Sequence, residues 1–129
     1  MANYVVYNAI GTIQRVGECT ETDVPLQAGA GEFVLVPDIV CSDATHYVLN
    51  GELQELQDFP EITQEVVNDS GEYTITLANI PEETSVTWPD YFISQENDGA
   101  LECAVSFPDQ YLFLLENVCY FPLEVVVNV

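Results

Sequence analysis

The sequence predicts an all-β protein built as an antiparallel sandwich or barrel. Short runs rich in β-branched and aromatic residues recur at regular spacing, and glycine, proline or asparagine turn signals separate them. No apolar stripe at helical spacing extends beyond two turns. Residues 57–66 contain Pro60 and lose the strand pattern, so they are expected to connect two halves, with a short helical turn over Glu61–Val66 as an option.

In the first half, the predicted strands alternate with turns that contain glycine. Asn50-Gly51 separates two strand-like runs, which is a strong hairpin signal because a type I′ turn needs a positive φ at both central residues. Ala28-Gly29-Ala30-Gly31 is expected to form another turn. The expected strands are Tyr4–Tyr7, Thr12–Val16, Glu32–Val36, Thr45–Leu49 and Glu52–Leu56.

The second half begins with clean alternation over Glu72–Leu77, where Tyr73, Ile75 and Leu77 share one face. Proline residues close or separate several of the runs that follow. The further expected strands are Ser85–Trp88, Leu101–Phe107, Tyr111–Leu115 and Leu123–Val127.

Two of these strands are apolar on both faces, whereas a lone two-layer sandwich exposes one face of each sheet to water. The runs are Tyr-Leu-Phe-Leu-Leu at 111–115 and Val-Val-Val at 125–127. Either another segment of the chain or a neighbouring subunit must cover the second face. The candidate subunit interface consists of Tyr111, Phe113, Leu115, Val125 and Val127.

The charge of the chain excludes several partners. Its 22 acidic residues face one arginine, Arg15, and no lysine, for a formal charge of −21. Binding to nucleic acid or to an anionic membrane needs lysine and arginine, so neither is expected. Cations, a basic protein surface or further copies of the chain are the expected partners. The first residues lack a basic segment and a long apolar stretch, so synthesis in the cytosol without a signal peptide is expected.

Candidate residues for catalysis are few, and no enzyme activity and no cofactor are expected. His46 is the single histidine, and Cys41 lies five residues before it. No nucleophile elbow or phosphate loop accompanies them, so structural hydrogen bonds are the expected role of His46. The chain has four cysteines and no CxxC; free thiols are expected in a reducing cytosol, and pairing within each half is the simplest oxidised arrangement. They are Cys19, Cys41, Cys103 and Cys119.

Two loop features suggest ligands of other kinds. Asp90, Glu96, Asn97 and Asp98 precede Gly99 and offer oxygen atoms of the type that calcium prefers, although EF-hand spacing is absent and a plain acidic loop is the favoured interpretation. Aromatic residues cluster around Pro89 and could stack on a sugar, or could close one end of the sandwich. They are Trp88, Tyr91 and Phe92.

Two stretches of the chain resemble modules of bacteriophage tail-fibre and other virion proteins. The first joins G-T-I-Q-R-V-G-E-C at 11–19, L-Q-A-G-A-G-E at 26–32 and H-Y-V-L-N-G-E at 46–52. The second joins residues 80–87, F-P-D-Q-Y at 107–111 and Y-F-P-L-E-V at 120–125, and it is similar to the small Ig-like domain that follows such modules. Asp109 departs from the pattern, which usually has glycine there.

The resemblance implies a small N-terminal β-module over residues 1–66, followed by an Ig-like antiparallel β-sandwich over residues 67–129. It implies a non-enzymatic phage structural protein of the virion that binds other virion subunits, in repeated copies or as a homo-oligomer. A tail- or fibre-associated component and a capsid decoration protein are both compatible with it. The alternative function is a host-surface carbohydrate-binding module that uses Trp88, Tyr91 and Phe92.

Overall fold

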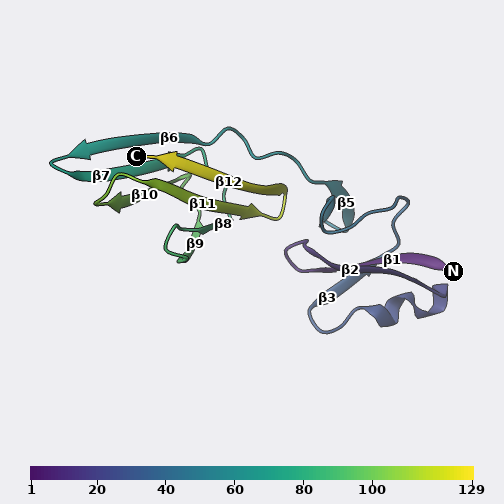
Figure 1. Cartoon of the computed structure of the whole chain (residues 1–129). Coiled ribbons are helices and arrows are strands. Elements are labelled where there is room, and N and C mark those ends of the chain that lie inside the picture. The colour runs from purple at the N-terminus through teal and green to yellow at the C-terminus, as the bar shows by residue number, and fades with distance from the viewer. The chain divides into compact units, whose positions relative to one another are not determined.

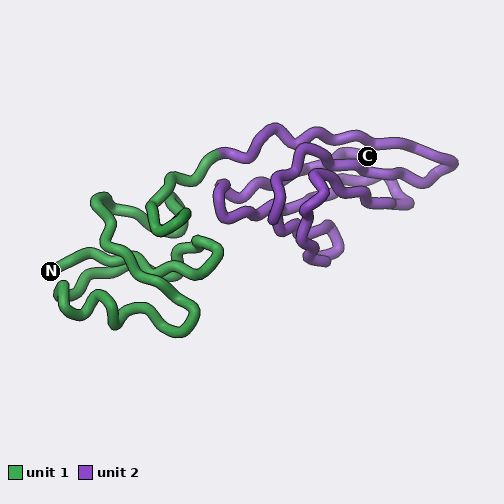
Figure 2. The backbone as a smooth tube through the Cα atoms, turned by 180° about the vertical axis from the view of Figure 1, so that it is seen from behind, with its two compact units in different colours: residues 1–57 green, residues 58–129 purple.

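The computed structural model describes residues 1–129 and confirms the all-β class, with twelve strands and one 3₁₀ helix. The chain forms two compact units, Met1–Gln57 and Asp58–Val129, which Figure 2 distinguishes by colour. The boundary therefore lies before residues 58–66, which belong structurally to the second unit rather than to the predicted first module.

Unit 1 is built on a three-stranded antiparallel sheet in the order β2-β1-β3 (Figure 1), formed by β1 (Ala2–Asn8), β2 (Ile13–Cys19) and β3 (Glu32–Leu35). The 3₁₀ helix η1 (Glu21–Gln27) contacts β1 and β3, and the hairpin of β4 (His46–Leu49) and β5 (Glu52–Glu55) supplies Val48. Val5 and Val6 are adjacent in β1 and point to opposite faces, yet both are fully buried. Both faces of the small sheet are therefore covered.

The turn between β1 and β2 is joined to β4 at Gly11. The Val48 N–H donates to the Gly11 carbonyl oxygen at 2.8 Å, and Gly11 has a φ of +98°. A Cβ atom at Gly11 would collide with the backbone carbonyl oxygen of Val48. Glycine is needed here for two reasons, because the left-handed backbone disfavours other residues and because the two backbones touch.

Unit 2 contains two antiparallel sheets in a sandwich-like arrangement. One has the order β10-β7-β6 and the other β12-β11-β8-β9. Inward side chains of both sheets form one core, which includes Ile75, Leu77, Phe113 and Leu115. The strands are β6 (Thr63–Asp69), β7 (Glu72–Ala78), β8 (Thr84–Thr87), β9 (Ile93–Glu96), β10 (Ala100–Val105), β11 (Gln110–Asn117) and β12 (Tyr120–Asn128).

The structure adds strands that the sequence pattern did not predict. Residues 63–66 begin β6 instead of forming a helical turn, and β6 pairs with β7 across the tight turn Ser70-Gly71, where both residues have positive φ. The short strand β9 is also new. The predicted Asn50-Gly51 hairpin is confirmed, with φ values of 52° and 78°.

Candidate functional site

Four of the five residues predicted as a subunit interface are buried within unit 2, and the fifth, Tyr111, is half-buried. Phe113 and Leu115 are fully buried, Val125 and Val127 are nearly so, and Tyr111 packs against the same core. Inward alternation along β11 and β12 directs these side chains toward the sheet that carries Ile75 and Leu77. The covering layer is thus a segment of the same chain, and Phe113, Leu115, Val125 and Val127 are not available to a neighbour.

The opposite face of the same strands carries the exposed apolar side chains. Leu112 and Val126 are direct cross-strand partners and are 46% and 39% exposed. Leu114 pairs with Thr87, and Thr87 pairs with Ile93, which is 63% exposed. Directly paired residues point to one side of a sheet, so these side chains share the outer surface. We call this surface the outer face, defined by Leu112, Leu114, Val126, Thr87 and Ile93.

All the charged side chains of unit 2 are acidic. Residues 58–129 contain no lysine, arginine or histidine. Glu124 is the cross-strand partner of Leu114, and Glu116 lies two residues further along β11; both are exposed. The outer face is therefore apolar along its centre and acidic at its border.

The single arginine is engaged in unit 1. Arg15 Nη1 and Nη2 donate to the two carboxylate oxygens of Glu32 at 2.9 and 3.0 Å, and Nη2 also donates to the Gln27 carbonyl oxygen. The hydrogen bonds from Arg15 and from the Gly29 N–H lower the pKa of the Glu32 carboxyl below its usual value. This ion pair joins β2, the end of η1 and β3, so the only guanidinium has a structural role.

Because one ion pair accompanies 22 carboxylates, repulsion among the acids opposes folding. We expect the melting temperature to rise when NaCl increases from low to moderate concentration, since salt screens this repulsion. Differential scanning calorimetry at a series of salt concentrations measures the effect. A melting temperature that stays constant or falls contradicts the expectation.

The aromatic cluster near Pro89 is divided between the core and the surface. The Trp88 ring packs edge-on against Phe113 at a centroid distance of 5.9 Å, and its Nε1–H donates to Ser94 Oγ at 2.8 Å. Tyr91 is 86% exposed, and Phe92 is also exposed. Trp88 therefore closes the core, and only Tyr91 and Phe92 present their rings to solvent.

The acidic loop that resembled a cation site makes separate local hydrogen bonds. Asp90 accepts from the Phe92 N–H, Glu96 accepts from the Ser94 hydroxyl, and Asn97 accepts from the Glu83 N–H. No group of three or more His, Cys, Asp or Glu side chains is placed to hold a metal ion. These oxygens serve the geometry of the loop.

His46 begins β4, as predicted, and its Nδ1 lies 2.7 Å from the Thr45 hydroxyl oxygen. Its Nε2 is buried without a hydrogen-bond partner, so neither ring nitrogen bonds the Cys41 thiol. Burial raises the pKa of Cys41 above its ordinary value, which lowers its thiolate fraction at neutral pH. All four cysteines are free thiols, and neither pairing within a half is formed.

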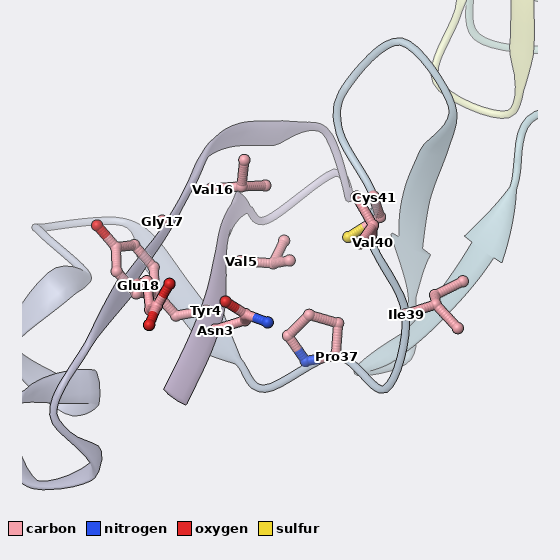
Figure 3. Close-up of a pocket in the computed structure, with 10 residues that line it drawn as sticks. All are labelled: Asn3, Tyr4, Val5, Val16, Gly17, Glu18, Pro37, Ile39, Val40 and Cys41. Atoms are coloured by element: carbon pink, nitrogen blue, oxygen red, sulfur yellow. The ribbon is translucent and has the colours of Figure 1, made fainter. Parts of the chain in front are cut away.

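Cys41 lines an apolar pocket of about 310 Å³ in unit 1. Figure 3 shows Val5 and Val16 on the sheet, with Pro37 and Cys41 of the following loop across the space from them. Polar groups at its rim come from Asn3 and Glu18. The volume lies at the lower end of ligand-site sizes and suits an apolar side chain or a small hydrophobic molecule.

The residues on which the virion resemblance depends are partly brought together. Arg15 of the first motif binds Gln27 and Glu32 of the second, and Gly11 binds Val48 of the third. The motifs therefore describe the framework of unit 1. The structure has no helix with the length and hydrophobicity that a membrane crossing needs. Comparisons with protein-family models, with curated proteins and with solved structures found no match.

Proposed function

We propose that the protein is a non-enzymatic structural component of a bacteriophage particle, where it binds other virion subunits through the outer face of unit 2. It acts as a tail- or fibre-associated protein or as a capsid decoration protein. The virion setting is supported by the sequence motifs of residues 11–52 and 80–125. The docking role is supported by the outer face.

The observation that carries the proposal is the exposure of Leu112, Val126 and Ile93 on one side of a single sheet. Contiguous exposed apolar patches with polar borders mark protein contact sites. Because Glu116 and Glu124 border the patch and unit 2 has no basic side chain, the matching surface is apolar with basic residues around it.

A protein inventory of purified particles tests the assignment. Mass spectrometry of particles from the phage that encodes this chain is expected to find the protein in a fixed ratio to known virion subunits. A ratio near that of the major capsid protein identifies a decoration protein, and a ratio near that of tail proteins identifies a tail component. Absence from the particles overturns the proposal.

Substitution of the outer face tests the docking mode. We expect Leu112→Thr combined with Ile93→Thr to reduce incorporation into particles about tenfold or more, because buried apolar contacts are lost at the interface. The matched control is Val67→Thr, which removes a similarly exposed apolar side chain on β6 of the other sheet. Equal incorporation of the double variant and the control, with both proteins folded, contradicts docking through the outer face.

The alternative function is a host-surface carbohydrate-binding module. Tyr91 and Phe92 favour it because both rings are exposed, but Trp88, the best stacking ring, is held against Phe113. Particles that lack the protein distinguish the two functions. A loss of adsorption to host cells by otherwise intact particles favours carbohydrate binding, and normal adsorption excludes it.

A further inference from the structure

The free edge of β12 borders a groove in unit 2. β12 is the last strand of its sheet and pairs with β11 alone. β6 is likewise an outer strand of the other sheet, and Gln64 near its start lines the same groove as residues 123–126 of β12. The groove has a volume of about 320 Å³ and is lined by Phe59, Pro60, Glu61, Ile62, Gln64, Leu123, Glu124, Val125 and Val126.

The backbone groups that face the groove follow from the hydrogen-bond pattern of β11 and β12. The Val129 N–H donates to the Asp109 carbonyl oxygen at 2.9 Å, which marks that pair as hydrogen-bonded. Hydrogen-bonded and non-hydrogen-bonded pairs alternate along an antiparallel ladder. The pairs Leu112–Val126 and Leu114–Glu124 are therefore non-hydrogen-bonded, and Glu124 and Val126 direct their N–H and C=O groups away from β11.

The groove is apolar on the side that packs against the core and acidic at its solvent-exposed rim. Phe59, Ile62 and Leu123 are partly buried and pack against the core. The Phe59 ring also contacts the Tyr120 ring at a centroid distance of 5.0 Å, which fixes this wall in place. Glu61 and Glu124 are exposed at the rim.

The edge has little protection against pairing with a basic strand. Proteins commonly guard edge strands with charged side chains, especially lysine, with proline or with a bulge. β12 has Pro122 and a register shift near its start, whereas Glu124–Asn128 continue in regular register and have Glu124 as their only charged residue. The Glu124 carboxylate repels an acidic strand and attracts a basic one, so the part of the edge that lines the groove is open to a basic strand.

We propose that this groove binds an extended segment of a basic partner protein, which adds to β12 as an antiparallel strand. Main-chain hydrogen bonds to Glu124 and Val126 hold the segment, and alternate side chains enter the groove. A second copy of this chain is disfavoured because it would bring further carboxylates to Glu61 and Glu124, and its only arginine is bound to Glu32. The inference concerns the strand edge and does not rest on the virion assignment; the edge shares Val126 with the outer face.

The register of the added strand follows from the same geometry. A residue in a hydrogen-bonded pair with Glu124 places its side chain on the same side of the sheet as Glu124. A lysine or arginine at that position lies beside the carboxylate. The two neighbouring residues point to the other side, toward Leu123 and Val125. The segment therefore alternates basic and apolar side chains.

The test uses the full chain and the probe peptide acetyl-Lys-Val-Lys-Val-Lys-amide. Binding is measured by calorimetry, and the contact is located by amide hydrogen exchange. We expect the amides of Glu124 and Val126 to become protected. A peptide N-methylated at the lysines loses the hydrogen bonds to β12 and is expected to bind about tenfold or more weakly. The peptide N-methylated at the valines, whose N–H groups point away from β12, is expected to bind normally.

A matched pair of protein variants separates strand addition from attraction of charge. Val126→Pro removes an outward N–H without breaking the ladder to β11, and is expected to weaken binding about tenfold or more. Val66→Pro is the control on β6, where the two-residue turn Ser70-Gly71 places the Val66 N–H on the free edge of the other sheet. It is expected to leave binding unchanged.

Three results overturn the proposal. They are an absence of binding to the wild-type chain, equal binding of both N-methylated peptides, and protection of β6 amides in place of Glu124 and Val126. Trp88 fluorescence, which reports the packing of Trp88 on Phe113, establishes that each variant is folded before binding is measured.

Discussion

Gly11→Ala is expected to destabilise unit 1 by about 3 kcal/mol or more. Two costs combine: a left-handed backbone costs a non-glycine residue about 1–2 kcal/mol, and the new Cβ displaces the Val48 carbonyl oxygen. The hydrogen bond from the Val48 N–H to Gly11 is then strained or lost. Because a unit of this size buries little apolar surface, such a loss is a large share of its stability.

Amide hydrogen exchange resolved by residue measures this effect within unit 1. Gly51→Ala is the matched control, because Gly51 also has a positive φ but a Cβ there meets no atom within 4 Å. The control is expected to cost about 1–2 kcal/mol through backbone conformation alone. If both variants cost the same, the close approach of Gly11 to Val48 has no energetic role.

Phe113→Ala is expected to destabilise unit 2 by about 3–5 kcal/mol. Phe113 is fully buried, contacts the Trp88 ring and lies in the core that both sheets share. Its neighbour Leu112 points to the outer face, so Leu112→Ala is expected to cost about 1 kcal/mol or less. The two substituted residues are adjacent in β11, but their side chains lie on opposite faces of the sheet.

Urea unfolding followed by Trp88 fluorescence measures this pair directly, since Trp88 is the only tryptophan and belongs to unit 2. The two variants also test which face of β11 is inward. A larger cost for Leu112→Ala than for Phe113→Ala would reverse the assignment of the core and of the outer face.

The sequence predicted the hairpins and alternating strands where local chemistry decides the structure. Asn50-Gly51 has the backbone preference of its turn, and Glu72–Leu77 alternates cleanly because one side of β7 is buried. β6 was missed for the opposite reason. All seven of its side chains are exposed, so burial imposes no alternation, and pairing with β7 alone makes it a strand.

The interface predicted on β11 and β12 grouped residues that share a face, but that face is directed into the core. The apolar residues on both faces of these strands indicated an apolar surface in addition to the one that faces the core. Phe113, Leu115 and Val125 do share a face. Which face turns inward depends on where the other sheet lies, and no local signal in Tyr111–Leu115 specifies that. The groove beside β12 could not be predicted from local sequence either, because its walls come from residues 59–64 and 123–126, which are far apart in the chain.

Arg15 is the only lysine or arginine in the chain and is paired with Glu32, which makes the protein an unusual substrate for trypsin-like proteases. A protease that cleaves after basic residues has one bond to attack, between Arg15 and Val16, and both residues lie within β2, paired with Val6 and Val5 of β1. Proteases cut chains that have opened, so the guanidinium must leave Glu32 and the strand must detach before cleavage. Tryptic digestion therefore reports the opening of unit 1 alone. Unit 2 has no arginine or lysine, so it stays uncut within the fragment of residues 16–129.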